Sequence, residues 1–182
     1  VPKSGVLNVT KTFENEEIAN LLNENNFSID VTGNFLSAVE NGEATIYNTM
    51  DSAKKVVNRD GTVTYSWSLA IFGEEYKVEE KNHNLDSDGW IYSKTEYVYT
   101  SIEGNAIKGE SASVTIRTER QFDDEGKKSQ TLAFSNYYTA IAKLDLKKVS
   151  ANSETPIPGA EFKLSKFDNG KWVVINEDIQ VN

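Results

Sequence analysis

Three residues that could together form an amide bond, Lys11, Glu80 and Asn136, occur in segments that alternate between apolar and polar side chains. Side chains two residues apart lie on the same face of a strand. The apolar residues that share a face with one of the three are Leu7, Val9 and Phe13; Tyr76 and Val78; and Leu132, Phe134 and Tyr138. Because the apolar face of a strand faces the core, each of the three strands is predicted to bury one polar residue.

A lone buried lysine or glutamate costs several kcal/mol unless it is paired or uncharged, so the simplest explanation for these residues is that they meet. Burial disfavours charge on both an amine and a carboxylic acid, and Lys11 and Glu80 can therefore both be neutral when they lie together. A neutral amine is a nucleophile, and the carboxamide carbon of Asn136 is an electrophile. Glu80 in its acid form could polarise the amide carbonyl and relay protons while ammonia leaves. Fixed geometry would supply the high effective concentration, and the product would be an amide between two side chains.

The alternation also allows a simpler interpretation. Lys11 could extend along the edge of its strand to solvent, with Glu80 as its salt-bridge partner and Asn136 capping a turn. Alternation alone does not decide between the two.

Most of the chain has the period-two pattern of β-strands and is rich in β-branched and aromatic residues. The predicted strands are Val6–Phe13, Phe27–Val31, Thr62–Ala70, Tyr76–Glu80, Ile91–Tyr99, Ser113–Thr118 and Thr131–Tyr138. Turns are predicted at Asp60-Gly61, Asp88-Gly89 and Glu125-Gly126, and one short helix at Asn15–Asn23. The pattern predicts an all-β chain, folded as an Ig-like antiparallel β-sandwich.

A second β unit is predicted to begin near Ala140, which divides the chain into domains 1–140 and 141–182. Its expected elements are a strand at Ala142–Ser150, a polar turn at Asn152–Pro158 and a strand at Ala160–Ser165. About 40 residues are fewer than usually fold alone, so we expect this second domain to be truncated here.

Composition excludes several classes of function. The chain has no cysteine and one histidine, which argues against thiol nucleophiles, disulfides and a metal site. Its net charge of −9 opposes binding to nucleic acid, and no apolar run reaches the length of a membrane span. Asp86-Ser87-Asp88-Gly89 has a slight likeness to a calcium loop but lacks the later glutamate, so we expect an ordinary turn. No cofactor is expected.

Three segments resemble known reactive strands: Val9-Thr10-Lys11, Tyr76-Lys77-Val78-Glu79-Glu80 and Phe134-Ser135-Asn136. They are similar to the Lys, Glu and Asn strands of isopeptide-forming pilin domains of Gram-positive bacteria, with the streptococcal major-pilin and collagen-adhesin B-type families as the closest comparison. The resemblance implies an autocatalytic bond between Lys11 and Asn136, with Glu80 as the catalytic residue. The first domain departs from the family by extra strands between Gly42 and Thr64.

The end of the chain also resembles the collagen-adhesin B-type family. Leu144-Asp145-Leu146-Lys147-Lys148-Val149 and Pro158-Gly159-Ala160-Glu161-Phe162-Lys163-Leu164 are similar to the opening strands of such a repeat. The resemblance implies that Lys148, on the apolar face with Leu144 and Leu146, is the cross-link lysine of the second domain.

The function implied by these resemblances is that of a structural stalk or shaft domain of a Gram-positive pilus or adhesin, extracellular and anchored to the cell wall. The cross-linking is single-turnover, so the chain is not expected to be an enzyme; no paired-carboxylate motif of a glycosidase stands out. Implied partners are neighbouring stalk domains, sortase-linked pilin subunits and a host extracellular-matrix ligand. The alternative is an adhesin domain that binds a host protein or glycan through an exposed face, with Trp67, Trp90, Tyr97 and Tyr99 as candidates, although such residues more often fill a core.

Overall fold

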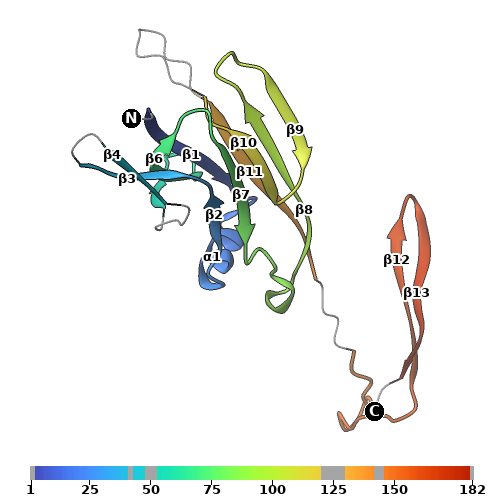
Figure 1. The fold of residues 1–182 in the computed structure, drawn as a ribbon. Coiled ribbons are helices and arrows are strands. Elements are labelled where there is room, and N and C mark those ends of the chain that lie inside the picture. Colours follow the sequence, from blue (N-terminus) through green and yellow to red (C-terminus); the bar gives the residue numbers. More distant parts are fainter. Residues whose placement is uncertain (1–2, 41–42, 48–52, 120–129, 142–145, 181–182) are drawn as a thin grey trace. The chain divides into compact units, whose positions relative to one another are not determined.

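The structure is a computed structural model that describes residues 3–40, 43–47, 53–119, 130–141 and 146–180. The chain forms two compact units, Val1–Ile141 and Ala142–Asn182, which divide one residue after the boundary expected from the sequence. Figure 1 shows the fold of each unit. In the parts of the chain that the structure describes, no helix is long and apolar enough to cross a membrane.

One layer of the first unit is a large sheet, in which eight strands are described. Their order is β4-β3-β6-β1-β11-β8-β9, and β5 also pairs with β6. The strands are β1 (Ser4–Thr12), β3 (Phe35–Glu40), β4 (Glu43–Tyr47), β5 (Lys54–Val57), β6 (Val63–Ile71), β8 (Trp90–Thr100), β9 (Ala106–Glu110) and β11 (Thr131–Ala140).

The second layer is a three-stranded sheet in the order β10-β7-β2. Its strands are β2 (Ser28–Thr32), β7 (Glu75–Lys81) and β10 (Ser113–Arg117). Figure 1 shows this sheet in front of the large one. The two layers share one core, to which both contribute buried apolar side chains, among them Val9, Val31, Tyr76, Val78, Ile116 and Phe134. The prediction of an all-β fold is therefore confirmed.

The predicted helix forms as α1 (Glu16–Glu24), one residue later than expected. The side chain of Asn15 caps it by accepting a hydrogen bond of 2.9 Å from the backbone amide of Ile18. Ile18 and Leu22 are buried, so the helix closes one end of the core.

The first and last strands of the first unit run side by side in the same direction. β1 pairs with β11 in parallel and with β6 in antiparallel fashion. A fully antiparallel sandwich was the expectation, and this pair departs from it. Parallel neighbours need a long crossover connection, and here all the intervening strands provide it.

The segment between residues 42 and 64 contributes strands to the large sheet, as the sequence predicted. β4 pairs with β3, and β5 pairs with β6. The predicted turn at Asp60-Gly61 joins β5 to β6, with Gly61 at φ 84°, where a residue without a Cβ is favoured. The predicted turn at Asp88-Gly89 ends a short 3-10 helix, η1 (Asp86–Asp88), while Glu125-Gly126 lies outside the described residues.

The second unit contains a hairpin of β12 (Glu161–Asp168) and β13 (Lys171–Gln180). β12 matches the strand expected from Ala160 and is longer. The strand expected at Ala142–Ser150 is wrong for residues 146–150, which form only an isolated bridge between Val149 and Pro156.

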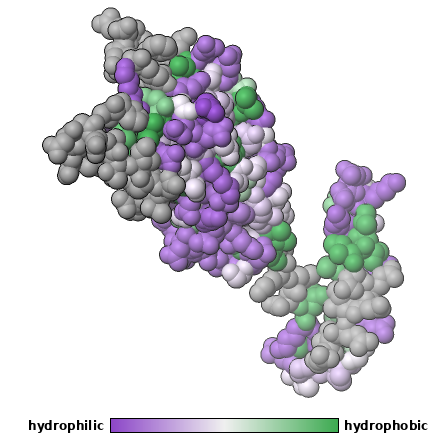
Figure 2. Space-filling model, viewed as in Figure 1, coloured by the Kyte–Doolittle hydropathy of each residue, from purple (hydrophilic) through white to green (hydrophobic). Residues whose placement is uncertain are grey.

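The hairpin leaves many apolar side chains exposed, because two strands alone cannot cover both of their faces. Figure 2 shows hydrophobic residues gathered on it. The large exposed ones are Phe167, Trp172, Val173, Val174 and Ile175.

Candidate functional site

Lys11 lies in the middle of the core of the first unit. β1 alternates, so that Leu7, Val9 and Lys11 are all buried, and the lysine is 0% exposed. Its Nζ is 2.7 Å from Oε1 of Glu80 and 5.3 Å from the centre of the Phe27 ring. The interpretation in which Lys11 reaches solvent along a strand edge is therefore wrong.

Glu80 reaches the lysine from the opposite layer. It lies on β7, where Tyr76, Val78 and Glu80 face the core, and it is 4% exposed. Its backbone amide donates to the carbonyl of Ala112 at 2.8 Å, which fixes the strand at this position.

Asn136 approaches from the strand beside the lysine. Lys11 is paired in register with Phe134 on β11, so Asn136, two residues further on, is on the same core-facing side. It is 3% exposed and in mid-strand, which rules out a turn cap. Its Nδ2 donates to the hydroxyl of Tyr138 at 3.3 Å, and that hydroxyl donates to the carbonyl of His83 at 2.7 Å.

Thr95 completes the group, and the sequence pattern did not reveal it. It lies on β8, in register with Asn136, and is 1% exposed. Its Oγ1 is 2.9 Å from Oδ1 of Asn136 and 3.2 Å from Oε2 of Glu80. The hydroxyl of Tyr92 lies 2.8 Å from the same Oγ1.

We call these four residues, Lys11, Glu80, Thr95 and Asn136, the core cluster. Its polar atoms form one continuous path from amine to carboxyl, hydroxyl and carboxamide. The three residues that the sequence singled out therefore do lie in one connected group.

The surroundings of the core cluster favour uncharged groups. Burial lowers the pKa of the Lys11 amine, against the opposing attraction and hydrogen bond of Glu80. Burial also raises the pKa of Tyr138 and that of Tyr65, each to about 12. An amine that gives up its proton more easily than a surface lysine, held at a carboxyl group, is a usable nucleophile.

The chain has no match among known protein families, curated proteins or solved structures. Interpretation of the core cluster therefore depends on its own geometry. An amine, an acid, a hydroxyl and a carboxamide brought together out of water are the groups that an acyl transfer requires.

Lys148 takes no part in a comparable group. It is exposed and lies outside any strand, and its backbone carbonyl accepts from the amide of Ile157 at 3.0 Å. The core-facing position expected for it is not formed: among the described residues, 146–150 pair with residues 155–157 through one isolated bridge and two hydrogen bonds, and Lys148 stays exposed. Leu144 lies outside the described residues. A cross-link at Lys148 stays a prediction.

The aromatic residues considered for a binding face lie in the core or pack against it. Trp67 is 4% exposed, and Trp90, Tyr97 and Tyr99 are partly buried against the core. Within the described ranges, no group of three or more His, Cys, Asp or Glu residues could hold a metal ion.

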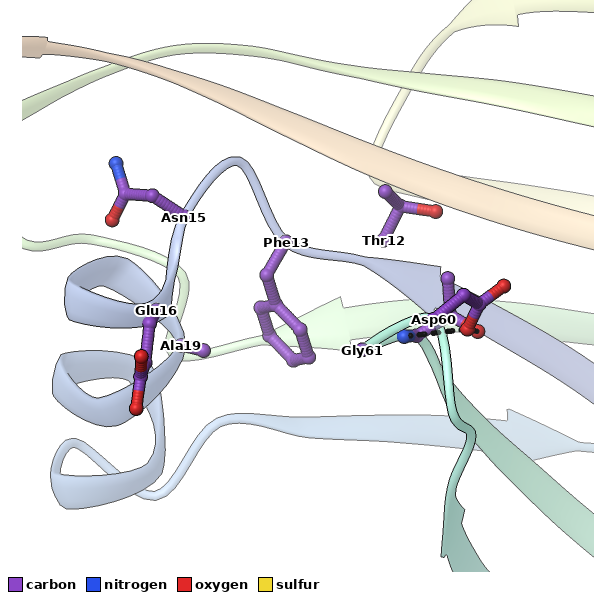
Figure 3. Close-up of a pocket in the computed structure, with 8 residues that line it drawn as sticks. Thr12, Phe13, Asn15, Glu16, Ala19, Asp60 and Gly61 are labelled. Atoms are coloured by element: carbon purple, nitrogen blue, oxygen red, sulfur yellow. Dashed lines mark hydrogen bonds between the residues drawn. The ribbon is translucent and has the colours of Figure 1, made fainter.

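A surface pocket of about 370 Å³ lies between the end of β1, the start of α1 and the turn before β6 (Figure 3). Phe13 lines it, and Asp60 accepts hydrogen bonds there from the amide and the hydroxyl of Thr62, at 3.0 and 2.7 Å. Because these bonds hold Asp60 within its own turn, the pocket offers no set of converging reactive groups.

Proposed function

We propose that the chain is a stalk or shaft segment of a Gram-positive surface pilus or adhesin, whose first unit is locked by an amide bond between Lys11 and Asn136. The observation that carries this proposal is the core cluster. A lysine that is 0% exposed contacts a buried glutamate at 2.7 Å, and that glutamate connects through Thr95 to a buried asparagine on the strand next to the lysine.

The chemistry is an exchange of amines on a carboxamide. The neutral Nζ of Lys11 attacks Cγ of Asn136, a new C–N bond forms, and the bond from Cγ to Nδ2 breaks. The lysine amine loses one proton and the leaving nitrogen gains one, so the second product is ammonia. Glu80 contacts Nζ directly and is the group that accepts and returns that proton.

The buried position of the reacting side chains explains why this reaction would need no separate enzyme. The reacting groups lie on neighbouring strands of one sheet and are held by the surrounding core, so proximity replaces a bimolecular encounter. The reaction happens once per molecule and consumes its own side chains; the chain is accordingly proposed not to be an enzyme.

The position of the bond suits a load-bearing segment. β1 and β11 are the first and last strands of the first unit, and force that enters at β1 and leaves at β11 would pass through the amide. Strands β2 to β10 would then be shielded from unfolding. Because the link is an amide and not a disulfide, the reducing agents that open disulfides could not cleave it.

A stalk outside the cell wall experiences shear and proteases, which is the setting in which an irreversible bond is useful. We propose that its partners are neighbouring domains of the same stalk, with sortase-linked pilin subunits and a host matrix ligand as further ones. The second unit is proposed as part of a further β domain, because its hairpin exposes Phe167 and Trp172 at 62% and 71%.

The intact mass of the denatured chain tests the bond. We expect the purified chain to be lighter than its calculated mass by one ammonia, and a proteolytic digest to contain a branched peptide that joins Lys11 to Asn136. Lys11→Ala, Glu80→Ala and Asn136→Ala should each restore the full mass, apart from the substitution. Lys94→Ala is the matched control, since Lys94 is also paired with glutamates but at the surface, and it should keep the deficit. A wild-type chain of full calculated mass would refute the proposal.

A further inference from the structure

The hydroxyl of Thr95 has more polar neighbours than it has hydrogens. Its Oγ1 is 2.9 Å from Oδ1 of Asn136, 3.2 Å from Oε2 of Glu80 and 2.8 Å from the hydroxyl of Tyr92. A threonine hydroxyl can donate one hydrogen bond and accept two. The number of contacts fits, but only one assignment of hydrogens makes all three of them hydrogen bonds.

That assignment is fixed by the amide oxygen, which cannot donate. The threonine hydrogen must go to Oδ1 of Asn136, and Glu80 and Tyr92 must both donate to Oγ1. Glu80 can donate only in its acid form. If Glu80 were a carboxylate, the single hydroxyl hydrogen of Thr95 could serve either the carboxylate or the Asn136 carbonyl, but not both. The other oxygen would then face Oγ1 with no hydrogen between them, and a buried unsatisfied contact of this kind is costly.

We propose that Thr95 is a catalytic residue of the cross-linking reaction, in which its hydroxyl relays a proton from Glu80 to the carbonyl oxygen of Asn136. This inference rests on the proposed amide bond. The relevant atoms form a continuous path, with Nζ of Lys11 2.7 Å from Oε1 of Glu80, Oε2 3.2 Å from Oγ1 of Thr95, and Oγ1 2.9 Å from Oδ1 of Asn136.

In the first step the Nζ–Cγ bond forms and the π electron pair of the carbonyl moves to Oδ1. Nζ gives a proton to Oε1, Oε2 gives its proton to Oγ1, and Oγ1 gives its own to Oδ1. Glu80 and Thr95 end the step with the same number of protons as before. The net change is one proton moved from Nζ to Oδ1.

In the second step the carbonyl reforms and the bond from Cγ to Nδ2 breaks. The proton on Oδ1 returns to Oγ1 of Thr95, and Thr95 passes its own proton to Oε2 of Glu80. Glu80 gives up the proton on Oε1 to Nδ2, which leaves as ammonia. Both residues are again unchanged, and no group from outside the chain is needed.

The relay also explains why a threonine stands here. A buried glutamate that contacts the amine with one oxygen has its second oxygen directed elsewhere, and in this structure that oxygen meets Thr95 rather than the amide. The threonine extends the reach of the acid to the carbonyl oxygen. It also places a donor where negative charge develops.

The test compares the rate of ammonia loss in Thr95→Val, Thr95→Ser and the wild type. Each chain is synthesised in a short pulse, samples are denatured at intervals, and the intact mass gives the fraction cross-linked. Thr95→Val keeps the shape and removes the hydroxyl, and we expect it to slow the reaction by about 100-fold or more. Thr95→Ser keeps the hydroxyl and should react within about tenfold of the wild type.

Thr118→Val is the matched control for loss of a buried threonine hydroxyl. Thr118 is 5% exposed and donates to the carbonyl of Ile71 at 2.6 Å, away from the core cluster. This variant should react at the wild-type rate. Neither threonine nor valine titrates, so Thr95→Val should lower the rate of cross-linking at every pH. The pH at which that rate declines should stay the same as in the wild type.

Each outcome decides. A wild type that loses ammonia while Thr95→Val reacts equally fast overturns the relay and leaves the proposed bond intact. A wild type that never loses ammonia overturns the proposed function and the relay together. If Thr95→Val does not fold, as judged by circular dichroism, Thr95→Ala is measured instead, and a wild-type rate in that variant overturns the relay.

Discussion

Replacing Lys11 by methionine is the most direct way to measure what the proposed bond contributes to stability. Methionine is unbranched and of similar length, so it fills the space of a side chain that is 0% exposed without leaving a large cavity. It has no amine, and the amide cannot form. Glu80 then loses the contact of 2.7 Å that it makes with the lysine.

The expected loss follows from the length of the closed loop. Lys11 and Asn136 are 136 − 11 = 125 residues apart, and a cross-link over that length stabilises by restricting the unfolded chain by about 5 kcal/mol. Glu80 without its partner adds about 1–3 kcal/mol. A second variant, Lys11→Met with Glu80→Leu, removes this extra cost, because an apolar pair in place of a buried amine and carboxyl is often no less stable. The double variant therefore isolates the loop contribution.

Guanidinium denaturation followed by tryptophan fluorescence measures both variants against the wild type. A loss of about 5 kcal/mol corresponds to a fall in the denaturation midpoint of about 1–2 M and in the melting temperature of roughly 10–20 °C. Lys94→Met is the control, because its ion pairs with Glu96 and Glu110 are exposed and should contribute less than about 1 kcal/mol.

The loop argument fails if the wild type shows the ammonia deficit while both methionine variants unfold within about 1 kcal/mol of it. The bond would then exist without restricting the unfolded chain. If the single variant alone is destabilised and the double variant is not, the whole effect comes from the unpaired glutamate.

Three further predictions concern pH, packing and a buried hydroxyl. The rate of cross-linking, followed by intact mass, should fall in acid, because protonation turns the Lys11 amine into an ammonium that cannot attack Asn136. Because burial lowers the pKa of Lys11 from 10.5, the reaction should proceed well below the pH that an exposed lysine needs, and a reaction that starts only at that higher pH would contradict this. Gly33→Ala should destabilise the first unit by about 1–3 kcal/mol in thermal denaturation. The new Cβ would lie 2.4 Å from Cδ1 of Tyr76, a residue that is 0% exposed. An unchanged melting temperature would mean that the tyrosine ring can move. Tyr138→Phe should cost about 1–2 kcal/mol in denaturant, since its hydroxyl donates to the partly buried carbonyl of His83 at 2.7 Å. A neutral result would show that the carbonyl finds another donor.

Much of the fold of the first unit could be predicted because its strands are half buried. In β1, β7 and β11 every second residue faces one core, so the pattern of apolar residues carries both the strand and its orientation. That is also why Lys11, Glu80 and Asn136 could be found: each interrupts an otherwise apolar face.

Thr95 could not be found in this way. The pairing of β8 with β11 shifts its register between Tyr137 and Tyr138, where β8 skips Ser93. An irregularity of this kind changes which residues face the core, so alternation counted through the whole strand mixes the two faces. Threonine is also common on both faces of a strand, and its burial here gives no signal by residue type.

The expected strand around Lys148 failed for a different reason. Alternation predicts which face of a strand would be apolar, but a strand forms only where a neighbour accepts its hydrogen bonds. In the described part of the second unit, residues 146–150 have a single bridge, Val149 to Pro156, and Lys148 is exposed. The backbone of residues 155–157 pairs with this segment only over a short stretch, and sequence periodicity carries no information about how far such pairing extends.

The parallel pairing of β1 with β11 is the feature that links the fold to the proposed mechanics. An amide between two strands close together in the sequence would shield only the part of the unit between them, whereas one between the first and last strands places every intervening strand outside the load path. The same pairing solves the chemical problem, because register sets Lys11 opposite Phe134 and so brings Asn136 to the core face beside the lysine. The other two members of the core cluster come from other strands: Glu80 lies on β7 of the facing sheet, and Thr95 lies on β8, which is next to β11. Four strands must therefore be in place before the groups meet, and we expect the bond to form after folding and to preserve a structure that already exists.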